Sequence, residues 1–325
     1  MLAIGNAIVD VIATADDAFL TREGLPKGSM RLIDAEEATR LYDHMGPARE
    51  ISGGSAANSV AGIAMLGGRA GFVGQVADDQ LGAVFAHDIR ATGVEFTTPA
   101  RSGSNVPTAR CLILVTPDAQ RTMNTFLGAA QYLPAAALDE EQVRRADILY
   151  LEGYLWDPAE PRAAMERAIA ISKAAGNRVA FTLSDAFCIE RHRDSFNDLI
   201  DSGRIDILFA NEVEIMSLTQ EADFETALQK LASRLPLLVV TRGEHGAIAI
   251  EQGERAQVRA EPVEKVVDTT GAGDLFAAGF LAGVSQGRPL QESLRLGAIA
   301  AAEVISHYGA RPEADLKALV AERLG

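Results

Sequence analysis

In the C-terminal part of the chain, stretches with the apolar pattern of a strand alternate with stretches that have the apolar pattern of a helix. From about residue 140, short apolar runs of strand length are separated by longer stretches of helical character. This alternation predicts a mostly parallel sheet with helices on both faces, in which ligands bind beyond the carboxyl ends of the strands. The predicted strands are residues 147–151, 178–183, 206–210, 237–240 and 247–250, and the predicted helices are residues 161–175, 195–202, 213–217 and 226–234.

The N-terminal part begins with an almost continuous apolar run. Residues 2–14 predict one buried strand, interrupted by Asn6 and Asp10. These two side chains are four residues apart and would lie on the same face of a strand. Because a carboxylate is rarely buried without a partner, we interpret both as pocket residues that hydrogen-bond the hydroxyl groups of a sugar. The alternative is that Asp10 marks a strand end or a bulge.

Further elements are predicted on either side of the central alternation. Residues 108–115 and 120–127 alternate polar and apolar positions and are joined by a tight turn at 116–119, which predicts a hairpin with one exposed face. A turn and a strand are expected within residues 24–34, and Asp34 is expected to cap the helix that follows. Near the C-terminus, a helix is predicted over residues 290–309, closed by its last glycine.

The stretch 267–280 carries the most specific chemistry. A Gly-Ala-Gly turn at 271–273 leads directly into Asp274 and then into a small-residue apolar run that predicts a buried helix. The first turn of a helix leaves backbone N–H groups free, and the helix dipole adds positive potential there, so this turn can hold anionic oxygens. A carboxylate beside a bound anion predicts phosphoryl transfer with Asp274 as base. The alternative is an ordinary capped helix.

A second small-residue helix is predicted within residues 51–68. Gly53 and Gly54 open it and would let the backbone approach a ligand, although helix packing also explains such a pair. Asn58 stands among small apolar residues and is interpreted as a substrate contact. Neither glycine turn has the dinucleotide-binding spacing GxGxxG, and the sequence has no GxxxxGK[ST] loop, so a kinase with this sequence must hold its phosphates another way.

Composition narrows the class of protein and its partners. The chain has 325 residues, of which 48% are apolar and 23% charged, as in a globular enzyme with a large core. A net charge of −15 disfavours nucleic-acid and membrane partners. The first residues lack the basic region of a signal peptide and no apolar run is long enough to span a bilayer, so we expect a soluble, cytoplasmic protein. Cys111 and Cys188 show no metal spacing and are expected to be reduced and buried.

Four segments together resemble one family. The string Asp-Thr-Thr-Gly-Ala-Gly-Asp at 268–274 resembles the second signature of the ribokinase-like (PfkB) carbohydrate and nucleoside kinases. Residues 53–82 resemble the first signature, with Ala77 where the family usually has a glycine, so the local turn there can differ. Residues 211–214 match the family's NxxE motif, and residues 241–243 resemble its nucleotide-facing turn.

The resemblance covers nearly the full chain and implies a fold. It implies the α/β class: a ribokinase-like three-layer α/β/α sandwich with a mostly parallel central sheet, formed by residues 1–325 as a single kinase domain. A small β-sheet lid would be built from insertions roughly within residues 12–34 and 100–128. We expect a monomer or a homodimer formed through the lid.

The resemblance also implies a role for each motif residue. Asp274 would be the base, and the amides of the turn before it would stabilise the developing charge. For Asn211 and Glu214 a helix cap is the alternative, and for Arg121 a solvated hairpin charge. The implied catalytic residues are Gly271, Ala272, Gly273 and Asp274; substrate contacts are Asn6, Asp10, Gly54, Ser55, Asn58 and Arg121; nucleotide contacts are Asn211, Thr241, Gly243, Gly271, Gly273 and His307; Asn211 and Glu214 would hold Mg²⁺ through water, and Asp268 and Thr270 a monovalent cation.

The implied reaction uses ATP and Mg²⁺, with K⁺ as a further candidate cofactor, and a small-molecule acceptor. The segment Gly5-Asn6 with Asp10, followed by Gly53 to Ser59, looks most like the adenosine kinase branch of the family. The expected reaction is therefore phosphorylation of the 5′-hydroxyl of adenosine to AMP, a step of purine salvage. The alternatives are a ribokinase or another sugar kinase acting on ribose, fructose or 2-keto-3-deoxygluconate, and a non-catalytic sugar- or nucleotide-binding regulator.

Overall fold

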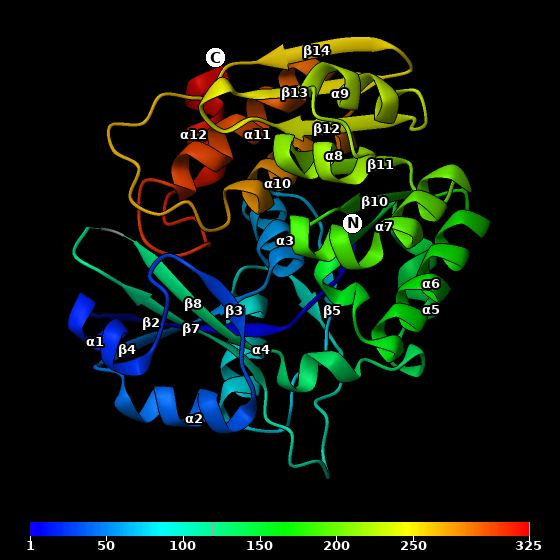
Figure 1. Ribbon diagram of the computed structural model, residues 1–325. Helices are drawn as coiled ribbons and strands as arrows, with labels where there is room; N and C mark the ends of the chain where they lie inside the picture. Colours follow the sequence, from blue (N-terminus) through cyan, green and yellow to red (C-terminus); the bar gives the residue numbers. More distant parts are fainter. Residues whose placement is uncertain (119, 325) are drawn as a thin grey trace.

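A computed structural model describes residues 1–118 and 120–324, in which a nine-stranded central sheet carries most of the chain (Figure 1). Its strand order is β14-β13-β12-β11-β10-β9-β1-β5-β6, and only β13 and β14 run antiparallel to their neighbours. The mostly parallel sheet predicted from the sequence is confirmed. The strands are β1 (Leu2–Ile4), β5 (Gly71–Val73), β6 (Glu95–Phe96), β9 (Ile148–Glu152), β10 (Arg178–Thr182), β11 (Ile207–Asn211), β12 (Leu237–Thr241), β13 (Ala247–Glu251) and β14 (Glu254–Val258).

Helices cover both faces of this sheet, which gives the three layers that were expected. Successive residues of a strand point to opposite faces of the sheet, so Leu238 packs into the apolar cluster on one face and Val239 into that on the other. The Val239 side holds α3 (Ser55–Met65), α4 (Gln80–Ala91), α10 (Ala272–Ser285), α11 (Leu290–Val304) and α12 (Leu316–Leu324). The Leu238 side holds α5 (Glu140–Arg145), α6 (Ala159–Ala174), α7 (Ala186–Asp201), α8 (Glu212–Thr219) and α9 (Phe224–Ala232).

A second, five-stranded sheet forms the lid, in the order β3-β8-β7-β2-β4. Its β7–β8 pair is the predicted hairpin, whose turn contains Ala119, outside the described residues. The segment that forms β4 lies outside both predicted insertions. The lid strands are β2 (Ile8–Thr14), β3 (Met30–Leu32), β4 (Ala48–Gly53), β7 (Ala109–Val115) and β8 (Arg121–Phe126), accompanied by α1 (Asp17–Glu23) and α2 (Ala35–His44); single 3₁₀ turns are η1 (Gly128–Tyr132), η2 (Ala135–Ala137), η3 (Gly153–Trp156) and η4 (Gly243–His245).

The prediction of one strand over residues 2–14 is wrong. The run is two strands in two sheets: β1 pairs with β5 and β9 in the central sheet, and β2 pairs with β4 and β7 in the lid. Both strands are largely buried, so the apolar pattern continues across the break at Gly5–Ala7. Asn6 therefore lies between the sheets and Asp10 within the lid strand, and the two are not on one strand face.

The prediction for the last long helix is also corrected. α11 ends at Val304, and Gly309 does not close it. Gly309 lies in the following loop with φ of 95°, and its N–H donates to Asp268 Oδ2 at 3.0 Å. The chain leaves the helix after Val304, with Ile305 as its cap, and the loop that follows brings Gly309 to the Asp268 carboxylate. Among the described residues, no helix is long and apolar enough to span a membrane.

Candidate active site

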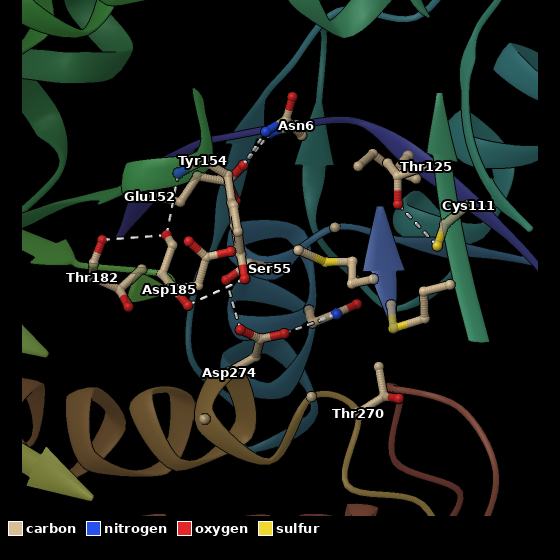
Figure 2. A pocket seen from close by; sticks show the side chains of 18 of the residues that line it. Asn6, Ser55, Cys111, Thr125, Glu152, Tyr154, Thr182, Asp185, Thr270 and Asp274 are labelled. Atoms are coloured by element: carbon tan, nitrogen blue, oxygen red, sulfur yellow. Dashed lines mark hydrogen bonds between the residues drawn. The ribbon is translucent and has the colours of Figure 1, made fainter. Parts of the chain in front are cut away.

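A cavity of about 530 Å³ lies between the lid and the carboxyl ends of the central strands (Figure 2). Strands β9 to β12 contribute residues at or just beyond their carboxyl ends, and the helices α3 and α10 contribute their first turns. This is the position expected for a ligand in an open α/β sheet. The predicted site residues that line the cavity are Asn6, Asp10, Gly54, Ser55, Asn58, Asn211, Glu214, Thr241, Thr270, Gly271, Ala272, Gly273 and Asp274.

Asp274 occupies the first turn of α10 and is held from α3. Ser55 Oγ donates to Asp274 Oδ1 at 2.6 Å, and Asn58 Nδ2 donates to Oδ2 at 3.0 Å (Figure 2). Burial raises the pKa of the Asp274 carboxyl above its usual value, while the two hydrogen bonds oppose that rise. The carboxylate is thus fixed in orientation, and burial makes it a stronger base than a solvated aspartate.

The turn before Asp274 has the geometry that an anion site requires. Gly271 has φ of 77°, and α10 begins after it without any side-chain cap. The first backbone bond of the helix is donated by Leu275 to the Gly271 carbonyl at 2.8 Å, so the amides of Gly273 and Asp274 precede the helical ladder. A Cβ placed on Gly273 would meet no atom within 4 Å. Amides that precede the helical ladder, with open space beside Gly273, fit the oxygens of a phosphate.

Asn6 is fixed by a buried glutamate that the sequence analysis did not single out. Glu152 ends β9 and is fully buried; its Oε1 accepts from the Asn6 backbone N–H and from Asn6 Nδ2, both at 2.7 Å. Its Oε2 accepts from the Ala56 N–H at 2.8 Å. Burial raises the pKa of the Glu152 carboxyl to about 7, against these three hydrogen bonds. The only signal for it in the sequence was its place directly after a predicted strand.

Gly54 shapes the same corner of the cavity. Its φ is 97°, and a Cβ there would lie 2.2 Å from the Asn6 carbonyl oxygen. Only glycine tolerates both the conformation and the approach. Asp10 lies next to the neighbouring Gly53 and is also buried. Burial raises the pKa of the Asp10 carboxyl to about 7, and the Arg311 guanidinium partly offsets this effect.

Asn211 and Glu214 begin α8 and form a complete capping box. Asn211 Oδ1 accepts from the Glu214 N–H at 2.9 Å, while the Glu214 carboxylate accepts from the Asn211 N–H at 3.0 Å and from Nδ2 at 2.7 Å. Both residues also line the cavity, so the helix cap does not exclude the predicted ligand role. Burial raises the pKa of Glu214 to about 7. Thr241, at the end of β12, pairs in register with Asn211.

Other predicted residues lie outside the cavity lining. Arg121, on lid strand β8, is paired with Asp268 at 2.8 Å and donates to Thr269 Oγ1 at 2.9 Å, so its guanidinium is held by two partners and does not project freely as a hairpin charge. Asp268 is buried and also accepts from Thr270. His307 contacts Glu303, and Gly243 belongs to η4 beyond the lining.

Several lining residues follow the central strands and belong to no recognised motif. Tyr154 and Asp185 lie after β9 and β10; the Tyr154 hydroxyl donates to the Ser184 carbonyl at 3.1 Å (Figure 2). Ser184 has φ of 73°, a strained value for a residue with a side chain. Phe187, at the start of α7, is 64% exposed although it lines the cavity. Position after a strand is the one signal that could have indicated these residues.

Comparison with known proteins identifies sugar and nucleoside kinases of one family. The profile described as pfkB family carbohydrate kinase matches residues 29–316. The crystal structure of adenosine kinase from Sinorhizobium meliloti is 49% identical, with a TM-score of 0.93 over 100% of this chain and 98% of that chain. That of a probable sugar kinase from Rhizobium etli is 47% identical, with a TM-score of 0.94 over 99% and 97%. A 5-dehydro-2-deoxygluconokinase from Shouchella clausii is 29% identical over 90% of this chain and 93% of its own.

Proposed function

Because this chain belongs to the pfkB family of carbohydrate kinases and is an ATP-dependent kinase, we propose that its acceptor is a nucleoside, adenosine, phosphorylated on its 5′-hydroxyl. The observation that carries this proposal is a group of apolar residues that line the cavity from the lid, beside the polar groups that lead to Asp274. The apolar residues suit a flat, uncharged base. These residues are Ile8, Met30, Leu32, Cys111, Met123 and Leu127.

The polar groups that lead to Asp274 suit a ribose. Asn6 and Asp10 lie near Gly54, and Ser55 and Asn58 lead from there to Asp274. A ribose held by these groups would have its 5′-hydroxyl directed toward the Asp274 carboxylate. The exposed Phe187 ring offers a further surface for the base.

The charges of the cavity disfavour a sugar acid such as a gluconate derivative. Of the described lining residues, the two arginines are both already paired: Arg31 with Glu37 at 2.5 Å, and Arg191 with Asp157 at 2.6 Å. The carboxylates of Asp185 and Asp274, which neither lining arginine pairs with, would repel an acceptor that carries its own carboxylate.

The chain's own groups account for each requirement of phosphoryl transfer. Asp274 would accept the proton of the acceptor hydroxyl, and burial favours this by raising the pKa of its carboxyl. The amides at the start of α10 would stabilise charge on the transferred group's oxygens. Asn211 and Glu214 would orient the water shell of Mg²⁺, and the lid would exclude bulk water. Mg²⁺–ATP, when bound, supplies the phosphoryl group and neutralises part of its charge.

The test is a comparison of acceptors with ATP and Mg²⁺ held constant. ADP release would be measured with adenosine, cytidine, ribose, fructose, 2-keto-3-deoxygluconate and 5-dehydro-2-deoxygluconate, and the product identified by mass. We expect the highest kcat/KM with adenosine and formation of AMP. A higher kcat/KM for any of the sugars or sugar acids would overturn the nucleoside assignment. Turnover of none of them would also overturn the adenosine assignment and would place the acceptor outside this panel.

A further inference from the structure

Behind Asp274, away from the cavity, lies an arginine that belongs to no motif. Arg311 is in the loop after α11, and its Nε donates to Asn58 Oδ1 at 2.9 Å. Asn58 Nδ2 in turn donates to Asp274 Oδ2 at 3.0 Å. A continuous chain of hydrogen bonds therefore runs from the C-terminal loop through α3 to the carboxylate at the start of α10.

The direction of this chain determines which end of the Asn58 amide faces Asp274. A guanidinium can only donate hydrogen bonds, so the Asn58 oxygen must face Arg311 and the NH₂ group must face the carboxylate. The reverse orientation would place two donors together and set an amide oxygen against a carboxylate. Ser55 donates to the other Asp274 oxygen at 2.6 Å, so both oxygens are held by donors.

The two terminal nitrogens of the Arg311 guanidinium, Nη1 and Nη2, interact with their surroundings through charge. Nη1 and Nη2 are buried and donate no hydrogen bond to the described residues. Burial of unpaired guanidinium nitrogens is unfavourable. Nearby carboxylates offset this cost, because their negative charge favours the protonated form of Arg311. They are Asp10 of β2, Asp88 of α4 and Asp274 of α10. Burial lowers the pKa of Arg311 to about 10, so it stays protonated at neutral pH.

We propose that Arg311 is a positioning residue for the base: it fixes the Asn58 amide toward Asp274 and supplies the positive charge that keeps this carboxylate ionised. This inference rests on the proposed role of Asp274. Arg311 does not line the cavity, so it acts on the base from behind. Other charged groups facing this region are Glu152 of β9 and the Asp268–Arg121 pair, and they are the same in each variant compared.

The test uses two variants that separate charge from hydrogen-bond geometry. Arg311→Gln removes the charge, and Arg311→Lys keeps it but loses the planar Nε donor. kcat would be measured against pH at saturating ATP, with the acceptor that the unmodified enzyme turns over fastest. We expect Arg311→Gln to move the acidic limb of kcat upward by about one pH unit or more. We expect Arg311→Lys to lower kcat while leaving that limb in place.

The control is Arg49→Gln, which removes an exposed arginine paired with Glu313 of the same loop at 3.8 Å. It should change neither kcat nor its pH dependence. Thermal midpoints of all variants show whether each is folded. If Arg311→Gln does not fold, the kcat of Arg311→Lys decides the test. An acidic limb that stays in place in Arg311→Gln, or an unchanged kcat in Arg311→Lys, would overturn the proposal. A fully active Asp274→Asn would instead overturn the base role on which it rests.

Discussion

Glu214 combines a structural and a chemical task in one side chain. Its carboxylate caps α8 through Asn211, and it faces the cavity with a pKa that burial raises to about 7. A bound hydrated Mg²⁺ would favour the ionised form and oppose this rise. The residue is therefore the most direct test of the proposed metal position.

We predict that Glu214→Gln raises the Mg²⁺ concentration needed for half-maximal activity by roughly ten-fold or more. Glutamine retains a capping-box side chain but lacks the charge that attracts the cation. Activity would be titrated with Mg²⁺ at fixed ATP. Glu212→Gln is the matched control, because Glu212 is on the same helix and pairs with Arg242 outside the cavity. Identical Mg²⁺ dependence of both variants would remove Glu214 from the metal site.

Asn6 and Arg311 show how far sequence reasoning extends at single positions. Asn6 was predicted as a pocket residue because a polar side chain interrupted an apolar run, and it lines the cavity. Arg311 could not be predicted, because its partner Asn58 is 253 residues away and no local pattern marks it. Glu152 was within reach, since it directly follows a predicted strand, but the fold alone shows that it holds Asn6.

At the scale of elements, the Arg121 side chain links the lid to the segment just before α10. Arg121 on β8 pairs with the buried Asp268 and bonds Thr269, just before the anion site. The Arg121 side chain is only 17% exposed, so solvent weakens this contact less than a surface pair. The contact ties lid position to the site where phosphate would bind.

We predict that Arg121→Ala increases ATP hydrolysis in the absence of acceptor several-fold relative to phosphoryl transfer. Release of the lid would admit water that a closed cavity excludes. Both rates would be measured on the same preparation. Arg110→Ala serves as the control, since Arg110 is on the adjacent lid strand and bonds Thr39 instead. An unchanged ratio of hydrolysis to transfer in Arg121→Ala would contradict a lid-fastening role.

Elements with a strong apolar periodicity could be predicted from the sequence, whereas the strand at the sheet edge and the very short strands could not. The strands β9 to β13 and the helices between them follow the apolar pattern to within a few residues, except that α7 begins at Ala186, well before the predicted 195. β14 is mostly polar at the sheet edge, and β5 and β6 have only three and two residues, too short for a period. The split of residues 2–14 was missed because burial is similar on both sides of the break.

At the scale of the whole molecule, the buried carboxyls and the negative net charge both lower the stability of the fold as pH rises. The pKa values of Asp10, Glu152 and Glu214 are raised to about 7 by burial, from ordinary values of 3.8, 4.5 and 4.5. The folded state then binds more protons than the unfolded state between about pH 4 and pH 7. Their contribution to stability is therefore present at low pH and is lost as pH rises through about 7. The net charge of −15 adds repulsion over the same range.

We predict that the ligand-free protein has a lower free energy of unfolding at about pH 8 than at about pH 5.5. Denaturant unfolding at a series of pH values would show this slope. Asp10→Asn should flatten it, because asparagine does not titrate. A free energy of unfolding that rises or stays constant over this range would show that these carboxyls are ionised in the fold at lower pH.

In the proposed reaction, a donor phosphate and an acceptor hydroxyl meet at the start of α10, with Asp274 as the base. The most direct measurement is the turnover of Asp274→Asn beside its acceptor-induced rise in thermal midpoint. We predict that kcat falls by roughly 10²-fold to 10⁴-fold while the thermal shift with adenosine is retained. Turnover close to that of the unmodified enzyme would contradict this proposal.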